Sequence, residues 1–384
     1  MIFASKKGGG IVLMTSITIL IKPSSSACNL DCAYCFYKDV SKNRDTYNNG
    51  FMNFDTLENI VREALTLNIK NVNFMFQGGE PTLVGIDFYK GLINFQEKYN
   101  INNTIITNSI QTNGINISED FVMFLSLNNF LVGVSLDGPK YIHDFYRTNY
   151  KYYGSYDDIM IFILLLKKYN VDFNILSVVT KLSSKYISDI YSFYRENDFK
   201  YIQFIPCIKK FDFSISYDSP DYYLDNETYL EFLDTLFSLW IEDLNNGNYI
   251  EIRNFMDYIT VLKGNPPTSC GMGGFCSLHT VIESNGDVSP CDFYCVDKWK
   301  LGNINSSSLN SIRNNHKARD FFNRSLYLHK ECKNCRVFKL CGGGCRRDLE
   351  PYIDGVPSFN YKCGAIKSFL ERNLDVLFQV SKFL

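Results

Sequence analysis

The chain has 384 residues, which is enough for two domains or for one barrel with an extension. Its hydrophobic content of 46% and charged content of 21% are those of an ordinary globular protein, and no stretch is long and apolar enough to span a bilayer. A net charge of −2 argues against a nucleic-acid-binding protein, which would normally carry a basic face.

Thirteen cysteines are present, several of them in CxxC pairs. In a chain this long, that pattern favours metal binding over disulfide bonds. Iron–sulfur clusters need reduced thiolates, so we expect a reducing cytoplasmic location. An apolar stretch over residues 11–21 imitates an export signal, but Lys22-Pro23 interrupts it before Cys28. Met14 is an alternative to Met1 as the first residue.

Six apolar runs, rich in Ile, Val and Phe, alternate with amphipathic stretches over the first 210 residues. Their nearly continuous hydrophobicity predicts parallel strands buried on both faces. A helical pattern over residues 57–65 could be capped by Asn53 or Asp55. We therefore expect an α/β fold, a partial TIM-like (β/α)6 barrel with its active site at the C-terminal ends of the strands. The predicted strands span residues 17–23, 72–77, 104–111, 131–136, 173–179 and 201–206.

The pattern changes after residue 210. Residues 211–225 are polar, a helical pattern follows over 229–245, and the remainder is rich in Cys and Gly and short of long periodic elements. We expect a second domain held together by metal more than by a large core. The predicted division is a core domain over 14–235 and a cluster-binding domain over 236–384, which includes a short linker helix.

Three cysteines in a CxxxCxxC spacing follow the first predicted strand: Cys28, Cys32 and Cys35. Three thiolates can hold three irons of a four-iron cluster and leave the fourth iron open, whereas ferredoxin clusters are closed by a fourth Cys. An open coordination position marks a reaction site. A zinc knuckle is the alternative. The spacing is the signature of radical S-adenosylmethionine (SAM) enzymes, and the chain resembles that superfamily from this point on.

The second predicted strand ends at Gln77-Gly78-Gly79-Glu80-Pro81. Gly78 and Gly79 allow close backbone approach to a ligand, and Glu80 can accept from a cationic amine. A tight turn is the alternative. One β–α unit after CxxxCxxC, this segment resembles the one that holds the SAM amino group in the superfamily.

The fourth predicted strand leads into Ser135-Leu136-Asp137-Gly138-Pro139. The resemblance implies that Ser135 contacts the SAM ribose and that Arg147 pairs with the SAM carboxylate, a geometry that suits a guanidinium fork. The alternatives are a turn at Asp137-Gly138 and a solvated charge at Arg147. Asn113 is equally a pocket residue or a turn residue, since Asn-Gly so often forms turns.

Eight further cysteines in the C-terminal third could close two four-iron clusters, or could form two zinc sites. Their arrangement resembles the SPASM extension of radical SAM peptide-modifying enzymes. That resemblance, and not the spacing, implies two interleaved sets and a total of three [4Fe–4S] clusters. Cys207 and Cys295 belong to neither set. The first set is Cys270, Cys276, Cys291 and Cys345, and the second is Cys332, Cys335, Cys341 and Cys363.

Residues 22–30, 77–82, 291–294, 301–304 and 343–347 resemble the anaerobic sulfatase-maturating enzymes. The resemblance implies oxidation of a Cys or Ser in an unfolded sulfatase to Cα-formylglycine, through a 5′-deoxyadenosyl radical made from SAM. It implies that Asp292 is the proton acceptor, since a partly desolvated carboxylate is a better base. Tyr37 and Gln77 would orient the peptide. Arg346-Arg347 would bind a peptide backbone or an acidic group, or form a solvated pair.

The resemblance implies two partners, a peptide substrate and an electron donor such as flavodoxin or ferredoxin. We expect a monomer that binds neither nucleic acid nor membrane. One alternative is a maturase of ribosomal peptides, forming thioether crosslinks or epimerising residues. Such enzymes usually carry an added N-terminal domain, and only about sixteen residues precede the first predicted strand. Another alternative is a metal-binding interaction protein without turnover.

Overall fold

The computed structural model describes residues 15–211, 222–353 and 356–384. All six predicted strands are present, and their ends agree with the prediction to within one residue. Neighbouring strands pair in parallel from the first to the sixth, so the predicted parallel sheet is confirmed. The strands are β1 (Ser16–Lys22), β2 (Asn71–Phe76), β3 (Ile105–Thr112), β4 (Leu131–Ser135), β5 (Phe173–Val179) and β6 (Tyr201–Pro206).

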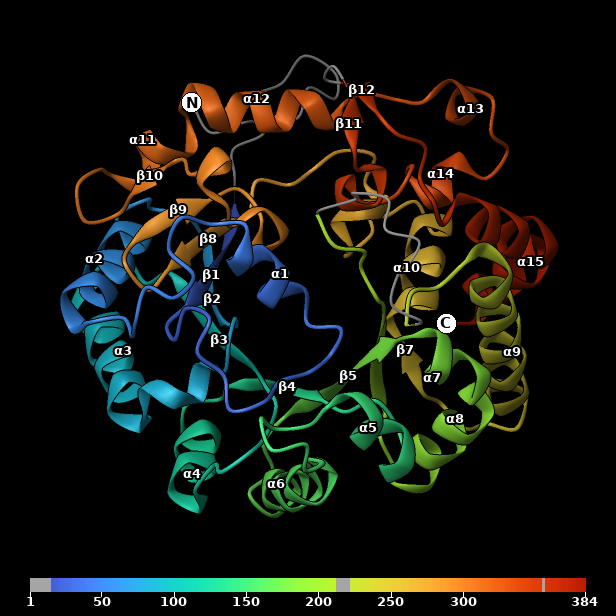
Figure 1. Cartoon of the computed structure of the whole chain (residues 1–384), viewed down its shortest axis with the longest axis horizontal. Coiled ribbons are helices and arrows are strands. Elements are labelled where there is room, and N and C mark those ends of the chain that lie inside the picture. Colours follow the sequence, from blue (N-terminus) through green and yellow to red (C-terminus); the bar gives the residue numbers. More distant parts are fainter. Residues whose placement is uncertain (1–14, 212–221, 354–355) are drawn as a thin grey trace.

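Amphipathic helices follow the strands and lie outside the arc of the sheet (Figure 1). In the first of them, α2, the Asn53 side chain accepts a hydrogen bond from the Thr56 amide, so Asn53 is the cap and Asp55 is not. The buried face of α2 comprises the apolar residues between 57 and 65 that the sequence singled out. The helices are α2 (Phe54–Leu65), α3 (Ile86–Tyr99), α4 (Glu119–Leu127), α5 (Lys140–Tyr146), α6 (Tyr156–Lys168), α7 (Lys181–Lys185) and α8 (Ile187–Glu196).

The C-terminal part extends the same sheet at both ends. The short strand β7 (Glu251–Ile252) pairs with β6, and β8 (Thr280–Glu283) pairs in parallel with β1. A meander of β8, β9 (Asp287–Ser289) and β10 (Gly302–Asn303) completes an open ten-stranded sheet, ordered β10-β9-β8-β1-β2-β3-β4-β5-β6-β7. The barrel is therefore partial, as expected, but its sheet has ten strands instead of the six that the sequence predicted.

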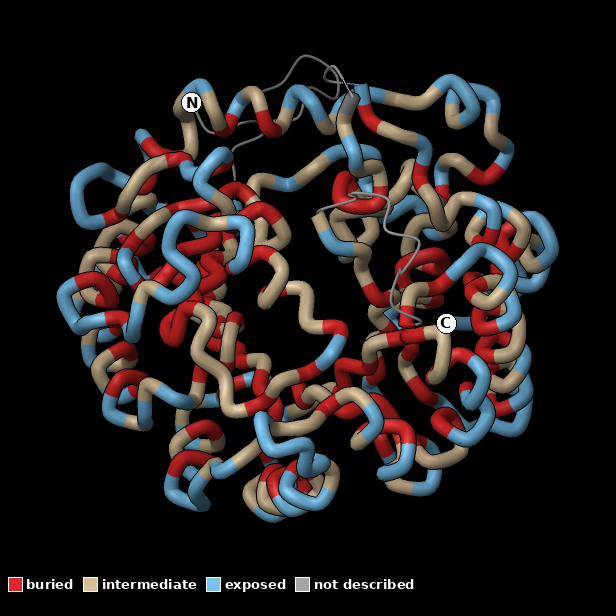
Figure 2. Tube along the Cα trace, viewed as in Figure 1, coloured by how far each residue is buried: buried red, intermediate tan, exposed pale blue. Residues whose placement is uncertain are grey.

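Long helices join the two parts through one continuous core. Helix α9 (Asn226–Asn245) runs through residue 235, where the domain division was expected. Helix α15 (Cys363–Phe383) is 21 residues long, so the expectation that the C-terminal part lacks long periodic elements is wrong. Phe369 of α15 packs 5.4 Å from Phe237 of α9 and 5.9 Å from Phe255 of α10 (Arg253–Leu262). Figure 2 shows buried segments of chain in red where α9, α10 and α15 pack together.

Shorter elements complete the C-terminal part. Most of the polar stretch 211–225 and both candidate start residues lie outside the described residues. Within the described ranges, no helix is long and apolar enough to cross a membrane. The shorter helices are α11 (Leu309–Arg313), α12 (His316–Ser325), α13 (Lys330–Lys333) and α14 (Phe338–Cys341), the 3₁₀ turns include Cys270–Met272, Asp292–Tyr294, Asp297–Trp299 and Arg346–Leu349, and β11 (Tyr352–Ile353) pairs with β12 (Val356–Pro357).

Candidate functional site

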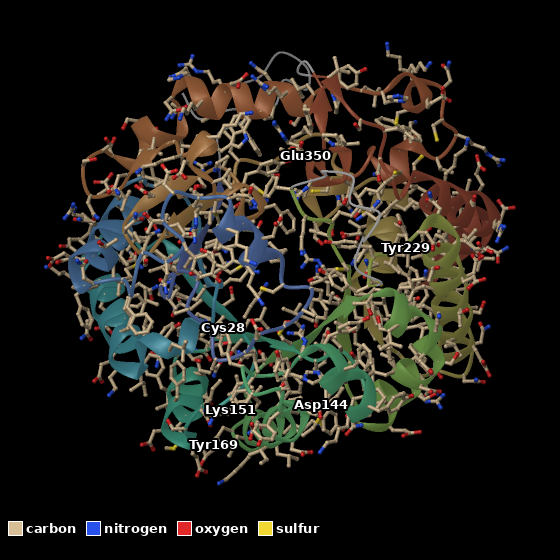
Figure 3. The ribbon with its side chains drawn as sticks, viewed as in Figure 1. Cys28, Asp144, Lys151, Tyr169, Tyr229 and Glu350 are labelled. Carbon is tan, nitrogen blue, oxygen red and sulfur yellow. The ribbon has the colours of Figure 1, made fainter. Side chains whose placement is uncertain are left out.

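The three cysteines of CxxxCxxC lie in one loop between β1 and the short helix α1 (Phe36–Lys42); Figure 3 labels Cys28 in this loop, inside the ring of helices. The Cys28 sulfur accepts from the Leu30 amide at 3.4 Å and from Asn113 Nδ2 at 3.7 Å. Donors of this kind stabilise a metal-bound thiolate. Burial raises the pKa of Cys32 to about 12, so thiolate formation here needs a cation such as a bound metal. The donor set therefore fits an iron–sulfur cluster.

Gly78 and Gly79 let three segments of chain meet behind this cluster loop. Gly79 has φ +50°, and a Cβ atom there would collide with the carbonyl oxygen of Ala27 and lie 2.8 Å from that of Ser25. A Cβ atom on Gly78 would lie 2.7 Å from Cγ of Lys22. The close approach is thus to the cluster loop and β1, whereas the sequence led us to expect an approach to a ligand.

Glu80 lies at the centre of a buried hydrogen-bond group. Its Oε1 accepts from the Thr82 hydroxyl at 2.7 Å and the Thr112 hydroxyl at 2.8 Å, and its Oε2 accepts from the Asn113 amide at 2.8 Å. Burial raises the pKa of Glu80, and these hydrogen bonds oppose the rise. Asn113, which the sequence left open as a turn residue, thus joins the cluster loop to the Gly-Gly-Glu-Pro segment.

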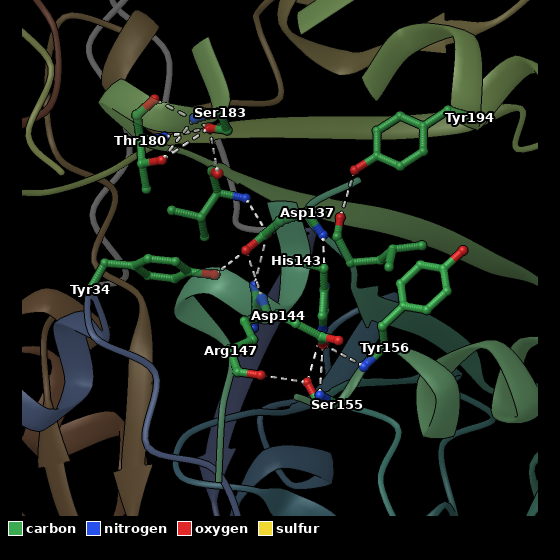
Figure 4. A network of polar contacts seen from close by, with 12 residues as sticks. Tyr34, Asp137, His143, Asp144, Arg147, Ser155, Tyr156, Thr180, Ser183 and Tyr194 are labelled. Atoms are coloured by element: carbon green, nitrogen blue, oxygen red, sulfur yellow. Dashed lines mark hydrogen bonds and ion pairs between the residues drawn. The ribbon is translucent and has the colours of Figure 1, made fainter. Parts of the chain in front are cut away.

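Asp137 organises the end of β4, and sequence reasoning missed it by reading Asp-Gly as a turn (Figure 4). Its carboxylate accepts from Arg147 Nε at 2.8 Å and Nη2 at 3.2 Å, from the Val178 amide at 2.8 Å, and from the Tyr34 hydroxyl. Burial raises the pKa of Asp137, but the Arg147 charge, its hydrogen bonds and the Tyr34 hydroxyl together hold that pKa below its usual range. A carboxylate at the C-terminal end of a buried strand was the available signal.

Arg147 is 7% exposed, so the alternative of a solvated charge is wrong. Its pairing with Asp137 and the hydroxyl of Tyr34 joins β4 to the cluster loop, between Cys32 and Cys35. Ser135, predicted to contact the SAM ribose, is the half-buried last residue of β4. Ser135 precedes Asp137 by two residues, so this predicted ribose contact lies close in the chain to the buried pair of Asp137 and Arg147.

Tyr37 and Gln77, which are predicted to orient the peptide, differ in how far they are buried. Gln77 is half-buried just after β2, and its amide donates to the Ile21 carbonyl at 3.0 Å. Tyr37 is 4% exposed, and its hydroxyl donates to Glu283, the last residue of β8. Glu283 also pairs with Arg44 at 2.9 Å. No local sequence pattern indicates that the C-terminal part of the chain holds Tyr37.

Lys22 lies directly beneath Tyr37, with Nζ 4.0 Å from the ring centroid. The side chain is fully buried, and its ammonium has no hydrogen-bond partner in the part of the chain that the structure describes. A cation over an aromatic face is stabilised by the ring quadrupole, which offsets part of the cost of burial. Lys22 and Glu283 thus fix Tyr37 from two strands, β1 and β8.

Asp292, the predicted base, begins the 3₁₀ turn that follows Cys291 and is half-buried. Its Oδ1 lies 3.5 Å from the Cys291 sulfur. The next residue, Phe293, packs against Phe36 with ring centroids 4.9 Å apart. Because Phe36 follows Cys35 directly, this contact brings the Asp292 turn against the cluster loop.

Seven of the eight C-terminal cysteines line one hollow of about 930 Å³, the cysteine hollow. Their thiols surround a space instead of converging on a point: among the described residues, no three His, Cys, Asp or Glu side chains lie close enough to hold one metal ion. Such a ring of thiols fits clusters as ligands. The seven are Cys270, Cys276, Cys332, Cys335, Cys341, Cys345 and Cys363.

Burial and neighbouring thiols raise the pKa values of these cysteines, and the division into two ligand sets stays a prediction. Burial, reinforced by Cys270, raises the pKa of Cys276 to about 11. Cys291 and Cys345 both have pKa values raised well above the usual range, first by burial and then by neighbours that include Cys270. In the other set, burial raises the pKa of Cys341 to about 11, and Cys363, Cys332 and Cys335 add to it.

Cys207 and Cys295 are packing residues in the structure. Cys207 is 4% exposed after β6 and packs with Leu30, Cys32 and Tyr34. Cys295 is 2% exposed, packs against Tyr37, and lies 3.6 Å from the Cys291 carbonyl oxygen. Both therefore border the cluster regions through apolar contacts.

Two family models match the chain: the radical SAM superfamily over residues 23–194 and an iron–sulfur cluster-binding domain over residues 270–336. A cysteine-type anaerobic sulfatase-maturating enzyme of Clostridium novyi (strain NT) is 46% identical, covering 97% of this chain and 99% of its own length. A serine-type enzyme of Bacteroides thetaiotaomicron is 32% identical, covering 90% of this chain and 86% of its own length.

Solved structures agree with the sequence relatives. A structure described as native anSMEcpe with bound AdoMet superimposes with a TM-score of 0.91 at 41% identity, covering 96% of this chain and all of that one. A second, with AdoMet and a Cp18Cys peptide bound, gives a TM-score of 0.90 at 40% identity, covering 96% and 99% of the two chains. With its radical SAM and iron–sulfur domains in the same order and its length matched almost end to end, the chain belongs to the family of anaerobic sulfatase-maturating enzymes.

Proposed function

We propose that this enzyme oxidises a cysteine of an unfolded sulfatase to Cα-formylglycine. A Cβ hydrogen atom, the thiol proton and one further electron would be removed to give a thioaldehyde, and water would hydrolyse the thioaldehyde to the aldehyde with release of hydrogen sulfide. The observation that carries the proposal is the contact between Phe36 and Phe293, which brings the Asp292 turn against the loop of Cys28, Cys32 and Cys35. The radical must take a hydrogen from the Cβ atom of the substrate cysteine, and the base must take the proton of the sulfur bonded to it, so the two must face one space. Cysteine is preferred over serine as the target because identity to the cysteine-type relative is 46%, against 32% for the serine-type one.

The proposed cofactors are SAM and three [4Fe–4S] clusters. Cys28, Cys32 and Cys35 would hold the cluster that binds SAM, and the two C-terminal sets would hold one auxiliary cluster each. When bound, the first cluster supplies an electron that cleaves SAM and so provides a hydrogen-abstracting radical. Glu80 and Arg147 would receive the amino and carboxylate groups of SAM, Ser135 its ribose, and Gly78 and Gly79 keep the cluster loop close to this pocket.

Asp292 would take the thiol proton of the substrate cysteine. Its half-buried position limits hydration of the carboxylate without removing it from contact with a peptide. Asp292 directly follows Cys291, so cluster binding by Cys291 would fix the backbone of Asp292 and the position of its carboxylate. The second electron removed from the substrate would pass to an auxiliary cluster in the C-terminal part. Gln77 and Tyr37 would orient the peptide.

The proposed partners are a sulfatase peptide and a small electron carrier such as flavodoxin or ferredoxin. We propose that the enzyme works in the cytoplasm as a monomer. A carrier is needed because the chain's own residues offer no source of the first electron. A reducing compartment keeps the cysteines as free thiols, so that those of the three sets remain available to bind clusters.

The test is anaerobic incubation of the reconstituted enzyme with dithionite, SAM and a peptide carrying a Cys-x-Pro-x-Arg sequence, read by mass spectrometry. Conversion of the Cys to an aldehyde with matching 5′-deoxyadenosine supports the proposal. A peptide with Ser at that position is the matched control, and faster turnover of Ser would contradict the choice of cysteine. The variant Asp292→Asn should still cleave SAM but should form little aldehyde. Deoxyadenosine with no change in either peptide rejects this substrate.

A further inference from the structure

A second hollow, of about 290 Å³, lies between the cluster loop and the C-terminal part. It is lined by Cys35 and Phe36 on one side and by Phe293 and Arg347 on the other. Cys35 is a predicted ligand of the first cluster, and Phe293 follows the predicted base Asp292. The hollow therefore lies between a predicted cluster ligand and the residue that follows the predicted base.

Arg347 is held rigidly at the wall of this hollow. Its side chain is 3% exposed, and its guanidinium carbon lies 3.7 Å from the centroid of the Phe211 ring. Nη2 donates to the Lys209 carbonyl oxygen at 2.7 Å and lies 3.7 Å from a carboxylate oxygen of Asp39. A guanidinium is planar, so stacking on Phe211 together with these contacts fixes the direction of every remaining N–H group.

The remaining terminal nitrogen of Arg347, Nη1, is buried and has no hydrogen-bond partner within residues 15–211, 222–353 and 356–384. Buried donors are nearly always paired, and an unpaired one is destabilising. The neighbouring Arg346 also has a buried nitrogen, Nε, without a partner among the described residues, but its Nη1 donates to the Phe321 carbonyl oxygen at 2.8 Å, and its side chain lines the cysteine hollow instead. Among the described residues, Arg347 lines the second hollow together with Phe293, whereas Arg346 does not.

We propose that Arg347 Nη1 donates a hydrogen bond to a backbone carbonyl oxygen of the substrate peptide, an inference that rests on the proposed function. Asp39 already offsets part of the guanidinium charge, so the missing group is an acceptor and not a second anion. A backbone carbonyl is present in every peptide whatever its side chains. The aromatic walls given by Phe36 and Phe293 suit the apolar faces of an extended peptide.

The first experiment is a backbone scan of the substrate peptide on the wild-type enzyme. Each amide near the target cysteine is replaced in turn by an ester, whose carbonyl oxygen is a weaker acceptor. One ester peptide should bind about ten- to a hundredfold more weakly than the parent, the range for a hydrogen bond to a charged group. If no ester peptide is weakened, the proposal fails, and this result does not depend on any variant folding.

The second experiment compares Arg347→Met and Arg347→Lys with Arg346→Met, each as the full chain with its iron content measured. Arg347→Met should raise KM for the parent peptide about ten- to a hundredfold, with kcat changed much less, and the sensitive ester should cause no further loss. Arg347→Lys keeps the charge but loses the planar geometry and should be intermediate. Arg346→Met should lower thermal stability yet keep the ester sensitivity.

An unchanged KM in Arg347→Met with full iron content overturns the proposal. So does an ester penalty that is equal in the wild type and in Arg347→Met. Failure of the proposed function looks different, because the wild type would then leave the parent peptide unconverted. In that case anaerobic titration of a fluorescent form of the same peptide still measures whether Arg347 contributes to binding.

Discussion

The buried pair of Asp137 and Arg147 offers the sharpest test of how the SAM-side loops are held. We consider Asp137→Asn, which keeps the size of the side chain but removes its charge. The Arg147 guanidinium, 7% exposed and donating two hydrogen bonds to Asp137, would be left without a counter-charge. The Tyr34 hydroxyl and the Val178 amide would keep at most a weaker acceptor.

Breaking a buried ion pair by removing one partner costs about 3–5 kcal/mol of folding free energy, because the other charge stays buried and unpaired. Removing both charges in Asp137→Asn/Arg147→Met should cost clearly less than the sum of the two single changes, by about 1–3 kcal/mol. Because the pKa of Asp137 is lowered from 3.8, its contribution is fully present above that pH and is lost only as the pH falls further. The pair is therefore fully effective at neutral pH.

The assay is urea unfolding of the anaerobically purified protein near neutral pH, together with SAM binding measured by titration. The destabilised Asp137→Asn variant should also bind SAM more weakly, since Tyr34 and the cluster loop lose their anchor. A loss below about 1 kcal/mol in Asp137→Asn, the level expected of an exposed pair, would refute the reasoning. Strict additivity of the two single changes would refute it as well.

Three further predictions concern other positions. Burial lowers the pKa of His143 to about 3, so stability should fall as the pH drops from 6.5 towards that value, by about 1.4 kcal/mol per pH unit for this one group. His143→Gln should unfold more easily at neutral pH but show a shallower acid dependence in urea unfolding; an equally steep one would contradict the assignment. Gly79→Ala forces a Cβ atom onto the Ala27 carbonyl oxygen and should weaken both SAM binding and retention of the first cluster, measured by titration and by iron content, whereas wild-type values would mean that the loop can shift freely. Cys341→Ser and Cys291→Ser should each lose about one cluster's iron, and the double variant about two, by iron assay and electron paramagnetic resonance; loss of both clusters in either single variant would contradict the two sets.

The elements that the sequence predicted well are those with a strong local pattern. The strands from β1 to β6 are continuous apolar runs, and Asn53 caps α2 as a short polar residue before an amphipathic stretch. The strands from β7 to β10 were missed because they are only two to four residues long and acquire their pairing from distant partners. No local pattern of that length marks a strand.

The site follows the same division. The cysteine spacings are local patterns, so the sequence predicted them as ligands. The partners of the buried side chains lie far away in the sequence, so they were not predicted. Asp137 meets Tyr34 across 103 residues, and Tyr37 meets Glu283 across 246. A single sequence carries no sign of such pairs, so the contact of the Tyr37 hydroxyl with Glu283 was not foreseen, and the role of Tyr37 in orienting a peptide stays a prediction.

The position of β1 within the sheet has a consequence for how the enzyme is made. The first strand of the chain lies between β2 and β8, and its pairing with β8 starts only at Thr280. On the ribosome, β1 therefore stays an open edge beside the cluster loop until most of the chain has emerged, and such edges invite pairing with other chains. A nascent chain stopped before Thr280 exposes both that edge and the three thiols that follow it. Completion of the sheet by β8 is thus the step after which the first cluster site is protected.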